Sequence, residues 1–281
     1  MSVRIIVDST SDVTPEVRRR LNVVPLTIRF GDDEYVDGIT ISHKGFYEKL
    51  IESDSLPVTS QATPESFAKE LRKAREAGDS AVIITLSSKL SGTYQSAMIA
   101  AEEFSDMEIY VVDSESVAIG TGILAEFALT LVDSGMDAAS IAERVTKERE
   151  NVRVIAMLDT LEYLKQGGRI SKAAAIAGGI LSIKPVITLE KGEIVILGKA
   201  RGSRQGNNLL VKEIQASGGV DFSKPLLLGY TGLSDVLLQK YIEDSAFLWD
   251  EHIDSLRTTI VGSVIGTHAG PGVVAAAYFK K

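Results

Sequence analysis

The sequence predicts an α/β protein of two domains: an N-terminal three-layer domain with a parallel sheet, and a C-terminal domain with a mixed sheet. Three observations support this prediction. In the first half, short β-branched runs alternate with helical patterns, which is typical of parallel strands joined by crossover helices. Beyond Asp159 the pattern changes to paired strands and glycine-rich turns. The length of 281 residues also permits two compact cores.

The first half contains five expected strands and two clearly marked helix starts. The candidate strands are Arg4–Asp8, Val23–Phe30, Ala81–Leu86, Ile109–Asp113 and Val152–Leu158. Thr14–Pro15 and Thr63–Pro64 each place a hydroxyl at a helix N-cap. The proline that follows occupies the first helical position, where its missing N–H costs nothing. We expect the N-terminal domain to span residues 1–158.

The second half is expected to start with a glycine turn and a helix of small residues, followed by a hairpin. Ile183–Leu189 and Glu193–Ala200 are its predicted strands, joined by Lys191–Gly192. Val261–Phe279 is predicted to form a strand, a turn at Pro271–Gly272 and a second strand. The C-terminal domain is therefore predicted to span residues 159–281.

Composition excludes several classes of function. The formal net charge of -8 argues against nucleic-acid binding, which depends on Lys and Arg neutralising phosphates. The absence of cysteine excludes disulfides, thiolate catalysis and cysteine-ligated metals, and it fits a cytoplasmic protein. We expect no secretory signal, because the first residues lack a basic region and a cleavage site. The apolar segment Ala173–Ile183 falls well short of the roughly 20 residues that span a bilayer, so no stable membrane insertion is expected.

The first polar segment with a candidate binding role is Val58–Pro64. Open α/β sheets form their ligand crevices at strand ends and helix starts, and this segment lies at such a place. Capping of the next helix needs only Thr63, which leaves Thr59, Ser60 and Gln61 without a structural role. A binding role and a simple capping turn are both open on these residues alone.

The second polar segment, Thr85–Tyr94, follows a predicted strand and opens a helix. Free N–H groups and the positive end of the helix dipole favour an anion there, with Ser91 and the backbone near Gly92 as donors. The alternative is that Ser91 only caps the helix. One serine cannot easily serve fully in both roles.

The third polar segment, Gly266–Gly272, contains His268, one of three histidines. A histidine between small residues can donate to a carboxylate or phosphate, while the glycines allow a ligand to approach. The alternative is a hydrogen-bonded histidine in a tight turn. His43 and His252 lie in polar helical contexts and are predicted to be structural. Since the histidines are far apart, no metal site is predicted.

A locally basic region interrupts the otherwise acidic chain. Arg169 follows the paired glycines Gly167–Gly168, and Arg201 and Arg204 add further charge. Guanidinium groups suit phosphate recognition, and glycines allow close approach. The alternative is a solvated charged loop.

Two catalytic alternatives are weakly supported. Ser91, His268 and Asp113 would make a hydrolase triad, but Ser91 does not lie in a Gly-x-Ser-x-Gly elbow. Asp8–Asp12 lacks the two-apart aspartates of haloacid-dehalogenase phosphatases, so we expect this loop to cap the helix after Thr14 or to line the crevice. The ATP-binding pattern Gly-x-x-x-x-Gly-Lys is absent.

In their order and combination, these motifs resemble the DegV family, whose members include the fatty-acid-binding subunits of bacterial fatty acid kinase. The resemblance extends over nearly the whole chain. The matching segments are Val7–Thr10, Thr59–Gln61, Leu90–Tyr94, Asp159–Leu164, Gly167–Ile170, Lys184–Pro185 and His268–Gly272. One departure is Ala62-Thr63-Pro64, where many relatives have proline directly after Ser-Gln.

The resemblance implies that a long-chain fatty acid such as palmitate, stearate or oleate is bound, with its carboxylate at the domain interface. Thr59, Ser91 and His268 match the carboxylate ligands of the family. Gly92 adds a backbone donor, and the departure after Gln61 leaves Ser60 as a substitute donor. The tail is expected against neighbouring strands and two further parts of the chain, Ile170 and Ala173–Leu181.

The resemblance also implies a substrate-presenting subunit with no cofactor and no catalytic residue of its own. A separate ATP-binding kinase would phosphorylate the bound acid to an acyl phosphate. Arg169, Arg201 and Arg204 would then face the partner or the transferring phosphoryl group. The alternatives are a stand-alone fatty-acid carrier or sensor and, with less support, a lipid hydrolase that uses Ser91.

Overall fold

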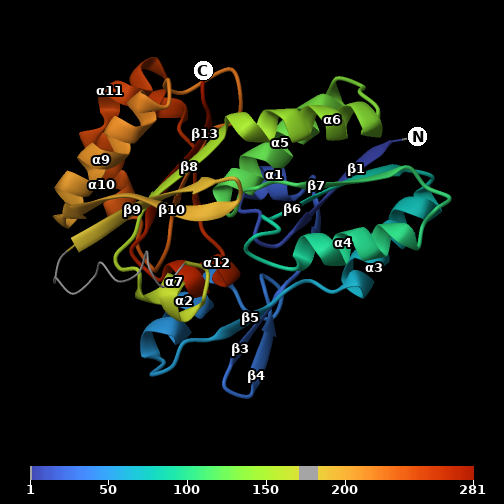
Figure 1. Cartoon of the computed structure of the whole chain (residues 1–281), viewed down its shortest axis with the longest axis horizontal. Coiled ribbons are helices and arrows are strands. Elements are labelled where there is room, and N and C mark those ends of the chain that lie inside the picture. Colours follow the sequence, from blue (N-terminus) through green and yellow to red (C-terminus); the bar gives the residue numbers. More distant parts are fainter. Residues whose placement is uncertain (1, 171–182) are drawn as a thin grey trace.

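The computed structural model describes residues 2–170 and 183–281, which form three sheets with helices between and around them (Figure 1). The strands are β1 Val3–Asp8, β2 Asn22–Val24, β3 Thr27–Phe30, β4 Asp33–Val36, β5 Val58–Ser60, β6 Ser80–Thr85, β7 Ile109–Asp113, β8 Val152–Met157, β9 Ile183–Glu190, β10 Glu193–Arg201, β11 Leu227–Tyr230, β12 Thr258–Ile260 and β13 Val274–Phe279.

The helices vary from single turns to four turns. They are α1 Pro15–Arg18, α2 His43–Glu52, α3 Pro64–Ala77, α4 Thr93–Glu102, α5 Ile119–Asp133, α6 Ala138–Glu148, α7 Glu162–Gln166, α9 Gly202–Ala216, α10 Val236–Asp244, α11 Ala246–Trp249 and α12 Ser263–Ala269. Within the described ranges, none of them is both long enough and apolar enough to cross a bilayer.

The N-terminal sheet is parallel, with the strand order β2-β1-β6-β7. Its side chains alternate between two buried faces, as the geometry of a strand requires. Ile6 and Ile83 pack with α3 and α4 on one face, and Val7 and Ile84 pack with α5 and α6 on the other. The predicted three-layer arrangement around a parallel sheet is confirmed.

The second sheet is mixed, with the strand order β10-β9-β8-β13-β11-β12, and this prediction is also confirmed. Figure 1 shows α9, α10 and α11 on the side of this sheet that faces away from the parallel sheet. Leu210 of α9, Tyr241 of α10 and Trp249 of α11 pack there against Ile155 and Ala276. A third, antiparallel sheet, β4-β3-β5, lies at the bottom of the view.

Helix α5 lies between the two larger sheets and is buried along nearly its whole length. Two glycines in its first turn allow contacts on opposite sides. A Cβ on Gly120 would lie 2.2 Å from Val154 Cγ2 in β8, and a Cβ on Gly122 would lie 2.0 Å from the backbone oxygen of Asp12. One hydrophobic core therefore continues from the parallel sheet through α5 to the mixed sheet.

Two strand predictions need correction. Val23–Phe30 is not one strand: it divides into β2 and β3, which belong to different sheets, because Pro25 between them has no N–H to continue a ladder. The strand predicted at Val152–Leu158 exists as β8, but it pairs with β9 and β13 inside the mixed sheet. The division at residue 158/159 stays a prediction, and sheet membership leads us to propose a boundary before β8.

The predicted strand-turn-strand at Val261–Phe279 is wrong in its first part, because α12 occupies it. Gly266 suggested a turn, yet it lies inside this helix, where a Cβ would be 2.5 Å from Tyr47 Oη of α2. Its missing side chain permits close helix packing instead. His268 consequently lies in the last turn of α12, ahead of the bend at Pro271–Gly272.

Other local predictions are confirmed. Thr63 caps α3 by accepting from the backbone N–H of Ser66 at 3.2 Å. Lys191 and Gly192 both have positive φ, 50° and 81°, which is the backbone of a type I′ hairpin turn. The Gly192 carbonyl accepts from the Ser87 hydroxyl at 2.7 Å, so the hairpin tip contacts the loop after β6.

The acidic loop after β1 is buried and joins distant parts of the chain. Asp12 Oδ1 accepts from the backbone N–H of Gly262 at 2.8 Å, just before α12, while Asp12 Oδ2 is buried without a partner among the described residues. Asp8 instead accepts from the backbone N–H and hydroxyl of Thr10 and from the Leu86 N–H. Thr14 precedes α1 without a side-chain cap, so the hydroxyl cap predicted there is wrong. The loop's carboxylates bond to Thr10, Leu86 and Gly262 and not to α1, and the loop does not line the cavity described below, so both expectations for it are also wrong.

Burial raises the pKa of Asp12 well above its ordinary value of 3.8. The folded chain therefore keeps a proton that the unfolded chain releases, and the stability of the protein falls as pH rises through that interval. We predict that Asp12→Asn removes this loss, making the variant more stable than the wild type at pH 8 and less dependent on pH. Denaturant unfolding between pH 4 and pH 8 measures the effect.

The matched control is Asp8→Asn. All partners of Asp8 are donors, so an amide nitrogen there would face a donor and cost about 1–3 kcal/mol, although burial raises the pKa of Asp8 as well. Equal destabilisation by the two variants at pH 8 would contradict a protonated Asp12.

Candidate ligand site

A cavity of about 400 Å³ lies where the mixed sheet, the start of α5 and α12 meet. Its wall is mostly apolar and comes from strands of the mixed sheet and from helices α5, α7 and α12. The contributing residues include Ile119 of α5, Val154 and Ala156 of β8, Ile187 and Leu189 of β9, Ile194 of β10, and Val264 and Ile265 of α12. A volume of this size falls within the range of small-molecule sites.

Two threonines in the wall have their hydroxyls engaged elsewhere. Thr188 donates to the Val154 carbonyl at 2.8 Å, and Thr231 donates to the Gly270 carbonyl at 2.7 Å. Thr231 also accepts from the Val273 N–H at 2.9 Å. Since these hydroxyl protons already have backbone acceptors, the two residues add little polarity to the cavity.

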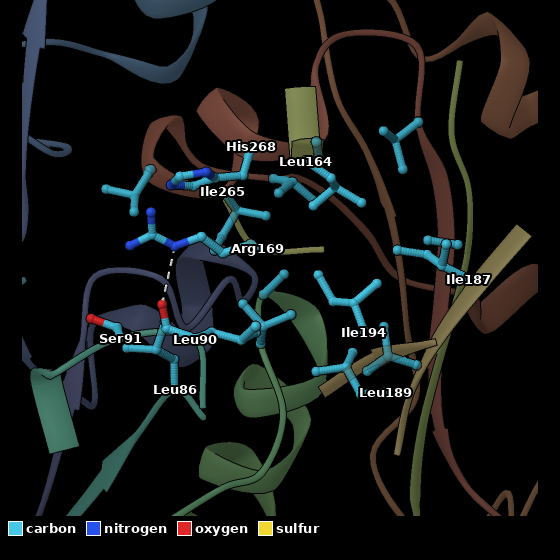
Figure 2. Close-up of a pocket in the computed structure, with 18 of the residues that line it drawn as sticks. Leu86, Leu90, Ser91, Leu164, Arg169, Ile187, Leu189, Ile194, Ile265 and His268 are labelled. Atoms are coloured by element: carbon cyan, nitrogen blue, oxygen red, sulfur yellow. Dashed lines mark hydrogen bonds between the residues drawn. The ribbon is translucent and has the colours of Figure 1, made fainter. Parts of the chain in front are cut away.

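Polar side chains gather at one end of the cavity. Figure 2 shows Ser91, Arg169 and His268 at this end, opposite Ile187 and Leu189. Three of the residues predicted from separate motifs meet here, namely Thr59 of β5, Ser91 before α4 and His268 of α12, and Ser60 and Gly92 line the same end. Thr59 Oγ1 and His268 Nε2 are 2.9 Å apart and form a hydrogen bond.

His268 is neutral near pH 7. Burial lowers the pKa of its imidazole to about 4, and the charge of Arg169 contributes in the same direction. Its Nδ1 atom is buried without a partner among the described residues. A Cβ on Gly167 would lie 2.1 Å from that atom, so this glycine allows the loop after α7 to cover the ring.

Arg169 lines the polar end but remains exposed to solvent. Its Nε donates to the Leu90 carbonyl at 3.2 Å, the contact drawn in Figure 2, and one terminal nitrogen donates to the Gly167 carbonyl at 2.6 Å. These bonds hold the side chain across the opening while part of the guanidinium stays available.

The sequence left Gln61 without an assigned role, and the structure gives it one. Its side-chain nitrogen donates to Ser96 Oγ at 2.9 Å, which joins the segment after β5 to α4. A Cβ on Gly92 would lie 2.1 Å from Gln61 Oε1. The motif Ser-Gly-Thr was the available signal, because glycine there allows the glutamine to lie over the helix start.

Several predicted residues lie elsewhere. Arg201 ends β10 and Arg204 is on α9, both exposed, and neither lines the cavity. Arg204 is close enough to Asp244 to help lower the pKa of that carboxyl, to which a hydrogen bond from Asn207 contributes most. Ile170 is buried but is not part of the wall, and Ala173–Leu181 lies outside the described residues.

The hydrolase triad is not assembled. His268 contacts Thr59 through Nε2, and its Nδ1 has no partner in the described part of the chain. The Asp113 carboxylate instead accepts from the backbone N–H groups of Ser88 and Glu115. Ser91 therefore has no base oriented by an acid. The described ranges also contain no cluster of three or more acidic, histidine or cysteine side chains suited to a metal ion.

A family described as uncharacterised proteins of the DegV family, COG1307, matches residues 2–281. The chain belongs to the DegV family. A DegV domain-containing protein of Caldanaerobacter subterraneus is 32% identical over 283 residues, which is 99% of both chains. The resemblance inferred from the motifs is thus confirmed for the family.

Solved structures of similar proteins have the same fold. A DegV family protein from Thermus thermophilus, described for its fatty acid binding, is 31% identical with a TM-score of 0.88, covering 99% of this chain and 100% of its own. A stearic-acid-binding protein from Eubacterium ventriosum is 25% identical with a TM-score of 0.84, covering 100% of this chain and 99% of its own.

Proposed function

We propose that this DegV protein binds a long-chain fatty acid, with the tail in the apolar cavity and the carboxylate at its polar end. The observation that carries the proposal is the cavity itself, an apolar space that ends in Thr59, Ser91 and His268. The descriptions of the Thermus and Eubacterium relatives support the same ligand class.

The binding free energies expected for the tail and for the carboxylate of such a ligand are consistent with this assignment. Each buried CH₂ contributes about 0.8 kcal/mol, so a long tail supplies most of the affinity. A buried carboxylate is costly unless it accepts hydrogen bonds. Ser91 can supply such a bond, and Thr59 can supply another when neutral His268 donates from Nε2 to Thr59 Oγ1 and so leaves the threonine proton free. Ser60 and Gly92 line the same end.

The predicted result is that protein purified from a bacterial host carries a fatty acid, which organic extraction and mass spectrometry identify. In delipidated protein, Ser91→Ala and Thr59→Val should each weaken palmitate binding by about 1–3 kcal/mol, because each removes a hydroxyl donor to the carboxylate. His268→Ala should weaken it by a similar amount, because the Thr59 hydroxyl loses the partner that orients it.

The control for these variants is Thr258→Val, which removes an exposed hydroxyl on β12. It should bind palmitate as the wild type does. Absence of any acyl chain, together with no binding of added palmitate or oleate, would overturn the proposed function. Normal affinity in all three head-group variants would place the carboxylate elsewhere.

The finer part of the proposal is that the bound acid is presented to a partner, an ATP-binding fatty acid kinase. A carboxylate oxygen attacks the γ-phosphorus of ATP, the new bond forms an acyl phosphate, and ADP leaves. The DegV protein would supply no catalytic group or cofactor to this reaction in the cytoplasm. Exposed Arg169 at the cavity opening supports this part, since guanidinium suits a phosphate or an acidic partner. Arg201 and Arg204 are exposed but do not line the cavity, so only the locally basic sequence supports including them.

We predict that Arg169→Glu and Arg201→Glu retain the fatty acid but reduce acyl-phosphate formation by the cognate kinase. Turnover should also fall with added salt, because exposed charge contacts are screened beyond about 8 Å at physiological ionic strength. Lys69→Glu, an exposed reversal on α3, is the control for charge alone.

Loss of lipid from the Arg169 variant would place that arginine in the head-group site. Full turnover in both variants would remove the arginines from the partner surface. If lipid binds but the kinase forms no acyl phosphate even with wild type, a stand-alone carrier or sensor becomes the better description.

A further inference from the structure

The hydroxyl of Thr93 contacts Ser91 in a way that determines what Ser91 offers to a ligand. Thr93 is the first residue of α4, and its side chain is fully buried, at 0% exposure. The two hydroxyl oxygens are 2.9 Å apart, and the backbone N–H of Thr93 also donates to Ser91 Oγ at 3.2 Å. Two groups of one residue therefore surround the same serine oxygen.

Burial decides which hydroxyl donates. The backbone N–H of Ala62 points to Thr93 Oγ1 at 3.4 Å, which occupies one side of that oxygen with a donor. If Ser91 donated as well, the proton of Thr93 would be buried without an acceptor, since Ser91 Oγ is the only acceptor within reach among the described residues. An unpaired buried donor is costly, so Thr93 donates to Ser91.

Ser91 Oγ then accepts twice, from the N–H and from the O–H of Thr93, which fills both of its lone pairs. The hydroxyl proton of Ser91 has no partner in the described part of the chain. Because Ser91 lines the polar end of the cavity, this proton is free to bond a ligand there. Hydrogen bonds in such a chain also polarise one another, which strengthens the last donor.

We infer that Thr93 is a positioning residue that makes Ser91 a pure hydrogen-bond donor, so the site selects a carboxylate over a head group that must itself donate. This inference rests on the proposed function and adds its chemical selectivity. A carboxylate only accepts, whereas the nitrogen of a primary amide has only protons to offer. The amide nitrogen would meet a donor at Ser91, so the amide can bind there only through its single oxygen, whereas either oxygen of a carboxylate fits.

The segment after β5 keeps this geometry in place. Buried Ala62 supplies the N–H that faces Thr93, and Gln61 is fixed to α4 through Ser96. Thr59 lies on the same segment, in β5. The hydroxyls of Thr59, in β5, and of Ser91, in the loop between β6 and α4, are thus held by one set of contacts around the start of α4.

The test compares palmitate with palmitamide, the amide of the same length, on delipidated protein by displacement of a fluorescent fatty acid. Thr93→Val keeps the side-chain volume but removes the hydroxyl. One lone pair of Ser91 Oγ then becomes free, and the hydroxyl of Ser91 is no longer held in a single rotamer. Palmitate should bind about threefold more weakly, palmitamide more tightly, and the acid-to-amide ratio should fall about tenfold. Thr93→Ser should restore the ratio, and Thr93→Ala is a second variant without the hydroxyl.

Thr121→Val is the matched structural control. Thr121 also has a fully buried hydroxyl paired with a serine, Ser114, at 3.0 Å, but it lines no part of the cavity. It should lower the melting temperature without changing the acid-to-amide ratio. A wild-type ratio in both Thr93→Val and Thr93→Ala would overturn the inference while leaving fatty-acid binding intact. Failure of wild-type protein to bind palmitate would instead refute the proposed function.

Discussion

The contact on which the rest of the structure depends is the burial of α5 between two sheets. A helix usually presents one polar face to water, but this one packs against the parallel sheet on one side and the mixed sheet on the other. Gly120 and Gly122 make this possible, because a side chain at either position would meet β8 or the loop after β1. The two sheets are thereby held at a fixed separation.

That separation creates the cavity at the N-terminal end of α5. Val117, Ala118 and Ile119 line it where the helix begins, and the strands of the mixed sheet form the opposite wall. Ala118 adopts a φ of 54° with ψ of -130°, a conformation that non-glycine residues rarely have. Backbone strain at the wall of a site indicates that the packing around α5 dictates the shape of the cavity.

Neutral groups dominate the polar end, and this has a consequence for chemistry. In the proposed reaction, a tightly paired arginine would hold the carboxylate more firmly, but it would also withdraw charge from the oxygen that attacks the phosphoryl group. In the proposed site, the hydroxyls of Ser91 and Thr59, with neutral His268 bonded to Thr59, would bind the carboxylate without that cost to its nucleophilicity. Arg169 stays at the solvent side, where its bonds to backbone carbonyls leave it free to meet a second charged group.

The sequence predicted the parallel and the mixed sheet, the cap at Thr63 and three residues at the polar end, because strand periodicity and polar motifs at strand ends are local signals. Thr59 and His268 are 209 residues apart yet share a hydrogen bond, and only the motif order of the family related them. Gly266 misled the prediction, since a glycine needed for close packing looks the same in sequence as one needed for a turn. The sequence also could not predict that the Thr93 hydroxyl donates to Ser91, because this follows from the burial of Thr93 and from the N–H of Ala62, a neighbour only in the folded chain.

The most direct test of this account is a crystal structure of the protein with a long-chain fatty acid that carries bromine at its terminal carbon. The account predicts an anomalous peak for bromine among the apolar side chains of β8, β9 and β10, with the carboxylate within hydrogen-bond distance of Ser91 and Thr59. A bromine peak at the surface, or a carboxylate directed away from the polar end, would contradict it.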